Sequence, residues 1–105
     1  MGKPLDTTLP KEFRRRAEMA LPGRISRVVL FGSRARGDAE PDSDWDFAVF
    51  LTDTPNSKDR RALADAAYDL IVESGQFLQP VAFSESNANS KLLLLQRIAE
   101  EGLPI

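Results

Sequence analysis

The strongest constraint on the fold is the segment 28–50, which reads VVLFGSRARGDAEPDSDWDFAVF. Two short apolar runs, rich in β-branched and aromatic residues, flank a polar loop, and such runs are typical of buried strands. The first run ends at a Gly-Ser pair, Gly32 and Ser33. The second opens with two aspartates one residue apart, Asp44 and Asp46. The segment therefore predicts a strand–turn–strand unit with two carboxylates at the start of the second strand.

The remaining apolar patterns predict an α/β (α+β) domain, a small mixed β-sheet flanked by helices in the order α-β-β-α-β-α. Capping residues, prolines and glycines delimit the elements. The expected helices run from Thr7 or Thr8 to Leu21, from Asn56 or Ser57 to Ser74, and from Asn87 or Asn89 to Glu101. The expected strands are residues 25–31, 44–52 and 77–83, and Pro80 favours an edge position for the third. We expect one domain over residues 1–105, with a loose N-terminus at 1–7.

Composition limits the chemistry. The sequence has no cysteine and no histidine, which excludes disulfides, thiolate or zinc sites and histidine-based catalysis. A bound metal would be a hard cation with oxygen ligands, such as Mg²⁺, Mn²⁺ or Ca²⁺. The net charge of −2 argues against bulk electrostatic binding of nucleic acid. No apolar run approaches the length of a membrane span, so we expect a cytoplasmic protein without membrane contact, either monomeric or a homo-oligomer.

Alternation of side chains along a strand places Asp44 and Asp46 on one face, with α-carbons roughly 6.5–7 Å apart. Their carboxylates can converge on one metal ion or straddle two. The alternative is that Asp44 caps the strand and Asp46 faces water. Upstream, Gly32 lets the backbone approach a ligand closely, and Ser33 offers a hydroxyl group and can open a short helix whose N–H groups face a phosphate.

The Gly-Ser pair and the two aspartates occur together in one pattern: Gly-Ser, ten intervening residues, then Asp-x-Asp. The segment GSRARGDAEPDSDWDFAVF resembles the signature of the polymerase-β-like nucleotidyltransferase superfamily, in its minimal single-domain (MNT) branch. The resemblance implies that Gly32 and Ser33 hold the β- and γ-phosphates of a nucleoside triphosphate and that Asp44 and Asp46 bind Mg²⁺ or Mn²⁺. It also implies transfer of a nucleoside monophosphate, AMP from ATP, to a hydroxyl group of a protein or RNA acceptor, with release of pyrophosphate.

Arg36 is the best-placed cation for the triphosphate, because a guanidinium fork matches phosphate oxygens. We expect Arg34 to be solvated or in a surface pair. Members of the superfamily carry a third carboxylate on the following strand, which here, at 77–83, has no acid. Gln79 lies near the expected third-acid position, and Glu85 could substitute for it if the chain bends inward.

The resemblance also implies a partner, because this branch is commonly paired with a helical HEPN protein, a toxin ribonuclease. Two hypotheses stay open. One is a metal-dependent nucleotidyltransferase, which could be the antitoxin of a HEPN/MNT toxin–antitoxin pair. The other is a catalytically weak or inactive interaction module that binds and neutralises a partner protein.

Overall fold

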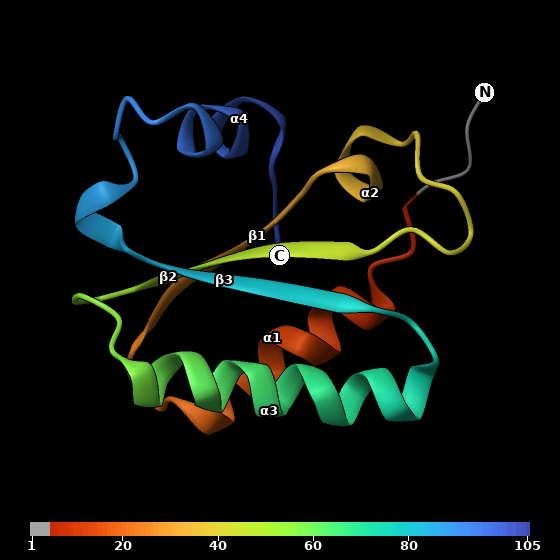
Figure 1. Cartoon of the computed structure of the whole chain (residues 1–105), viewed down its shortest axis with the longest axis horizontal. Helices are drawn as coiled ribbons and strands as arrows, with labels where there is room; N and C mark the ends of the chain where they lie inside the picture. The colour runs from red at the N-terminus through yellow and green to blue at the C-terminus, as the bar shows by residue number, and fades with distance from the viewer. Residues whose placement is uncertain (1–4) are drawn as a thin grey trace.

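The structure, a computed structural model, describes residues 5–105 as a four-stranded sheet with helices on both faces (Figure 1). Of the expected loose N-terminus, residues 1–4 lie outside the described residues, and 5–7 belong to no helix or strand. The elements in chain order are α1 (Thr8–Ala20), β1 (Ile25–Phe31), α2 (Ser33–Arg36), β2 (Trp45–Leu51), α3 (Ser57–Ser74), β3 (Leu78–Ser84), the 3₁₀ turn η1 (Glu85–Asn87), α4 (Leu93–Glu101) and β4 (Leu103–Pro104).

The sheet is mixed, as predicted, with the strand order β3-β2-β1-β4. β1 pairs antiparallel with β2 and β4, whereas β2 and β3 are parallel. The expected edge position of the third strand is confirmed, because β3 pairs only with β2 in this sheet of residues 5–105. The parallel pair brings the starts of β2 and β3 together at one end of the sheet, which decides what lies beside Asp46.

Both faces of the sheet are covered, which gives two apolar cores. On one face α1 and α3 form a layer against the strands (Figure 1). There Phe13 of α1 stacks on Phe47 of β2, with ring centroids 4.6 Å apart. On the other face, Leu95 and Ile98 of α4 pack on the sheet. Because β2 is covered from both sides, residues 47–51 are all buried, which explains their continuous apolar run.

The helix ends follow local chemistry. Asn56 and Asp59 form a reciprocal capping box at the start of α3, and Gly75 ends that helix in the left-handed conformation at φ +73°. The expected bounds of this helix, Asn56 or Ser57 to Ser74, agree with the structure. At α1 the expected threonine cap is absent, because Asp6 instead accepts the hydrogen bond from the Thr8 N–H at 2.9 Å.

Two C-terminal expectations need correction. The last helix begins at Leu93 and not at Asn87 or Asn89. The Ser84 hydroxyl group accepts from the Ser86 N–H and holds the chain in the 3₁₀ turn instead. The two-residue strand β4, which no pattern predicted, follows α4 and pairs with β1. Within residues 5–105, no helix combines the length and the apolar character needed to cross a membrane.

Asp59 is expected to stabilise the fold strongly for a charged residue. Its side chain is 4% exposed and accepts from Nη1 and Nη2 of Arg24, at 3.1 and 2.9 Å, and from the Asn56 N–H at 3.1 Å. These contacts, Arg24 above all, lower the pKa of Asp59. We expect Asp59→Ala to lower the free energy of unfolding at pH 7 by about 2 kcal/mol, measured by urea unfolding.

The pH dependence gives this prediction a sign. A lowered carboxyl pKa stabilises the fold above the unfolded pKa of about 4 and loses that contribution as the pH falls through the folded value. The difference in the free energy of unfolding between the wild type and Asp59→Ala should therefore become smaller below pH 4. The matched control is Asp53→Ala, because Asp53 contacts the same Arg24 but its side chain is 68% exposed. A gap that is equal for both variants would contradict the prediction.

Candidate active site

Gly32 joins β1 to α2 at the point where the chain passes Asp46. Its φ of +78° is in the left-handed region that favours glycine. A β-carbon added to Gly32 would stand 2.5 Å from Asp46 Oδ2. The end of β1 is in register with Asp46, since Phe31 is its cross-strand partner. Only glycine therefore allows the Gly-Ser turn to lie directly against this carboxylate.

The structure places Asp44 and Asp46 near each other, both partly buried, at the start of β2. Burial raises the pKa of Asp46, the negative charge of Asp44 raises it further, and Arg36 opposes both. Two carboxylates that repel each other in a partly desolvated position are stabilised by a cation. The expected convergence of the pair is consistent with this arrangement.

These donors fit a hard divalent cation. Among residues 5–105, no group of three or more acidic, histidine or cysteine side chains is arranged to hold a metal ion. Mg²⁺ typically uses one or two protein carboxylates and takes its other ligands from substrate phosphates and water. Asp44 and Asp46 can supply this donor set. The protein part of the site is thus suited to a metal ion that arrives with a polyphosphate.

Gln79 is the residue that faces Asp46 from β3. The two are cross-strand partners in the parallel pair, and neighbouring strands lie about 4.8 Å apart. Glu85 lies past the other end of β3, about 20 Å further along at strand rise, where it pairs with Arg27 at 3.2 Å. The structure therefore brings Gln79 to the site and does not bring Glu85 there. The side chain beside Asp46 is a neutral amide.

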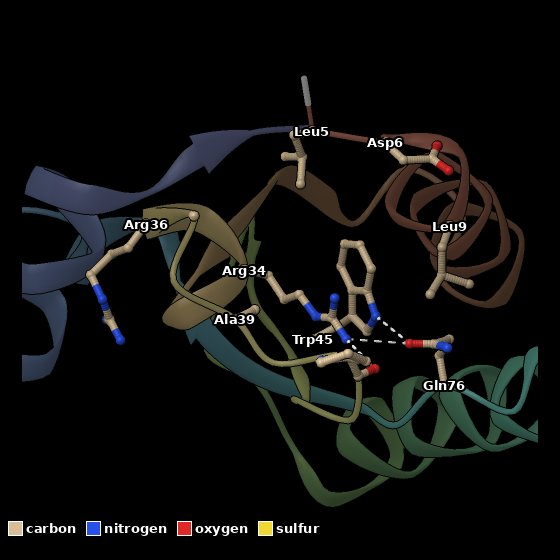
Figure 2. Close-up of a pocket in the computed structure, with 10 residues that line it drawn as sticks. Leu5, Asp6, Leu9, Arg34, Arg36, Ala39, Trp45 and Gln76 are labelled. Carbon is tan, nitrogen blue, oxygen red and sulfur yellow. Dashed lines mark hydrogen bonds between the residues drawn. The ribbon is translucent and has the colours of Figure 1, made fainter. Parts of the chain in front are cut away.

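Arg36 lies at the end of α2 in two ion pairs. It contacts Asp38 and Glu101, each at 3.2 Å. Figure 2 shows its side chain pointing away from Arg34 and Trp45. A phosphate that binds Arg36 would have to compete with these two carboxylates, which sequence reasoning did not anticipate because Glu101 is 65 residues away.

Arg34 differs from its sequence-based expectation. It is neither solvated nor in a surface ion pair, but half-buried over the Trp45 ring, with the guanidinium carbon 4.5 Å from the ring centroid. It donates to the carbonyl oxygens of Ser43 and Pro41. The Ser43 hydroxyl group accepts from the Glu40 N–H at 2.8 Å.

A cleft of about 950 Å³ opens beside this cluster (Figure 2). Its lining includes Arg34, Trp45 and Gln76, residues at and just before the start of α1, and residues 36, 37, 39 and 41 of the connection between β1 and β2. Trp45 points toward the core shared with α1 and α3, and alternation along β2 turns Asp46 to the other face. Neither Asp44 nor Asp46 lines the cleft, and Arg36 is the residue that belongs both to its lining and to the electrostatic surroundings of Asp46.

Fold and site together define a nucleotidyltransferase: a mixed sheet on which a Gly-Ser turn contacts an Asp-x-Asp strand. The chain belongs to the polymerase β nucleotidyltransferase family, whose model matches residues 18–105. Two proteins of Methanocaldococcus jannaschii, both named as candidate protein adenylyltransferases, are similar in sequence. MJ0141 is 28% identical over 76 residues, which are 72% of this chain and 77% of that protein. MJ0604 is 30% identical over 94 residues, 88% and 89% of the two chains.

Solved structures share the fold. A structure described as a minimal nucleotidyltransferase is 29% identical, with a TM-score of 0.56 over 92% of this chain and 95% of that one. A toxin–antitoxin structure with AMP-PNP has a TM-score of 0.64 at 21% identity, and the match covers 88% of this chain and 68% of that one. A third, a tri-AMPylated Shewanella oneidensis HEPN toxin in complex with an MNT antitoxin, gives 0.58 at 18% identity, over 92% and 71%. The expected fold is confirmed.

Gly32→Ala tests the contact between the turn and Asp46. The added methyl group would displace the Asp46 carboxylate, so we expect binding of Mg²⁺·ATP to weaken at least about tenfold in titration calorimetry. Gly37→Ala is the control for a methyl group added at positive φ without a clash, because Gly37 has a φ of +83° but no atom within 4 Å of an added β-carbon. Gly32, at φ +78° and ψ −157°, lies in a region that almost only glycine adopts, whereas Gly37 is left-handed helical, so Gly32→Ala also bears the greater backbone strain. Equal affinities in the two variants would contradict the prediction.

Proposed function

We propose that residues 1–105 form one minimal nucleotidyltransferase domain that transfers AMP from ATP to a hydroxyl group of a protein or RNA acceptor in a metal-dependent reaction. The observation that carries this proposal is the contact between the Gly32 turn and Asp46, next to Asp44. Family membership supports the reaction class. The names of the two archaeal relatives support adenylyl transfer and a protein acceptor.

The proposed roles follow from the chemistry of the residues. The acceptor hydroxyl group loses its proton to water while its oxygen forms a bond to the α-phosphorus, the bond from that phosphorus to the oxygen bridging to the β-phosphorus breaks, and pyrophosphate leaves. A divalent metal, when bound, neutralises charge on the phosphates. Asp44 and Asp46 would hold it, the turn at Gly32 and Ser33 would seat the β- and γ-phosphates, and Arg36 would bind phosphate oxygens. Such a reaction depends on positioning and charge more than on a protein nucleophile.

We further propose a helical HEPN-type protein as the acceptor and partner, so that the chain acts as the antitoxin of a pair. The support is the fold shared with an MNT antitoxin in complex with an AMPylated HEPN toxin and with a toxin–antitoxin structure holding AMP-PNP. A cytoplasmic location and a homo-oligomer stay predictions from the sequence.

One observation favours the second hypothesis, an interaction module with little turnover. The residue that faces Asp46 from β3 is Gln79, and an amide cannot accept the proton of the acceptor hydroxyl group at neutral pH. On this hypothesis the chain binds its partner and nucleotide but transfers AMP slowly or not at all.

The test is transfer of label from α-³²P-ATP with Mg²⁺ to a co-expressed HEPN-type protein. Label on the partner, dependent on both Mg²⁺ and this chain, would support the transferase. Formation of a stable complex without label would support the interaction module. Failure to bind ATP, Mg²⁺ or the partner would contradict both.

A further inference from the structure

Arg34 is hydrogen-bonded to the backbone that leads into Asp44. Its Nη2 donates to the carbonyl oxygens of Ser43 at 2.9 Å and Pro41 at 3.1 Å, and its Nε donates to Ser43 at 3.3 Å. The guanidinium group lies over the Trp45 ring at 4.5 Å, a favourable cation–π arrangement. Arg34 thus contacts the residue before Asp44 through its nitrogens and the residue after it through its flat face.

The other side of this cluster is tied to the start of β3. Trp45 Nε1 donates to Gln76 Oε1 at 3.1 Å, and the Trp45 N–H donates to the Phe77 carbonyl oxygen at 2.8 Å. Arg34 Nη2 also reaches Gln76 Oε1 at 3.4 Å. Figure 2 shows Arg34, Trp45 and Gln76 pointing toward one another. Asp44 directly precedes β2, so the β2–β3 ladder holds the backbone on its Trp45 side and the hydrogen bonds from Arg34 hold it on its Ser43 side.

We propose that Arg34 is a positioning residue for the metal-binding carboxylates, acting through the Ser43 carbonyl and Trp45 to hold Asp44 in place. The proposal rests on the proposed function, in which Asp44 and Asp46 bind the metal. Arg34 is engaged with neutral groups on the Trp45 side of the strand, opposite Asp46, and its hydrogen bonds go to none of the carboxylates. Groups that orient a metal ligand from behind typically change metal affinity 10- to 100-fold.

Charge and position make opposite predictions for this residue. Removing a cation from the neighbourhood of a metal site reduces electrostatic repulsion, so charge alone predicts tighter metal binding in Arg34→Met. Loss of positioning predicts weaker binding. The side chain of Met retains aliphatic contact with Trp45 but donates no hydrogen bond. The sign of the change therefore separates the two effects.

The experiment measures binding of Mn²⁺ alone, by the electron paramagnetic resonance signal of the free ion. The single tryptophan of the chain, Trp45, provides a second readout through its fluorescence. We expect Arg34→Met to raise the dissociation constant for Mn²⁺ about tenfold. Arg34→Lys, which keeps the charge but not the fork, should raise it by less, about threefold. It carries the test if Arg34→Met fails to fold.

Three controls keep the outcomes separate. Arg61→Met removes an exposed arginine of α3 and should leave Mn²⁺ affinity unchanged. Asp59→Ala lowers stability at a distant capping box and should also leave it unchanged. Asp44→Asn with Asp46→Asn should abolish binding. If the wild type binds Mn²⁺ and Arg34→Met binds it as tightly or more tightly, the positioning role is overturned and the proposed function stands. If the wild type binds Mn²⁺ only together with ATP, the same comparison of Arg34→Met with the wild type is made with Mn²⁺·ATP by titration calorimetry, and if the wild type binds neither, both proposals are overturned.

Discussion

Replacing both aspartates, Asp44→Asn with Asp46→Asn, is expected to abolish Mg²⁺-dependent binding of ATP and to lower AMP transfer about a thousandfold or more. The amides keep the shape of the carboxylates but remove both negative charges. The described residues contain no third acid positioned to compensate. Titration calorimetry with Mg²⁺·ATP and label transfer from α-³²P-ATP measure the two effects.

The double variant should nevertheless fold. Burial and Asp44 raise the pKa of Asp46, which means that its ionised form is disfavoured in the fold. We therefore expect the free energy of unfolding at pH 7 without metal to stay level or to rise. Asp42→Asn, an exposed acid of the same loop, is the control and should keep full binding and transfer. Retained Mg²⁺·ATP binding in the double variant would contradict the site.

The parts of the fold that were predictable are determined by residues close together in the sequence. β2 is an apolar run that is buried at all its residues except Asp46, and β1 is buried at residues 28–30, so both strands leave a clear apolar pattern in the sequence. α3 is delimited by the Asn56–Asp59 capping box and by Gly75, each of which acts within a few residues. The Gly-Ser turn and the Asp-x-Asp pair could likewise be linked from sequence, since a single connection, residues 32–44, joins β1 to β2.

The parts that were missed depend on contacts between distant segments. β4 is two residues long and pairs with β1 only because α4 returns the chain there. The start of α4 is delayed by the Ser84 hydroxyl group, which stabilises a 3₁₀ turn first. Neither effect leaves a periodic pattern, so hydrophobic spacing could not locate them.

The same limit applies to the site. The sequence suggests a surface position for Arg34 because its hydrogen-bond acceptors are backbone carbonyl oxygens. Every residue has such a group, so residue type does not show which of them will bind an arginine. Glu85 was a candidate for the third acid only while the position of the site along β3 was unknown. The parallel pairing of β2 and β3 places Gln79 beside Asp46 and Glu85 at the other end. Strand direction, not residue type, decides between them.

Gln79→Glu is expected to raise AMP transfer about a hundredfold at saturating Mg²⁺, because it places a third carboxylate beside Asp46 on the same face of the sheet. A carboxylate there can accept the proton of the acceptor hydroxyl group and add an oxygen ligand for the metal, which an amide does poorly. Label transfer from α-³²P-ATP to the partner measures the gain, relative to wild type at the same Mg²⁺ concentration.

Gln79→Glu should also lower the stability of the fold when no metal is bound. Three carboxylates close together repel one another, so without metal the melting temperature of Gln79→Glu should fall below that of the wild type, and Mg²⁺ should restore it. Val81→Glu is the matched control, because Val81 lies on the same face of β3 two residues further on, beside Ala48. It adds the same charge away from the aspartates and should raise neither transfer nor the dependence of stability on Mg²⁺. Equal transfer by Gln79→Glu and the wild type would show that the amide is not what limits turnover.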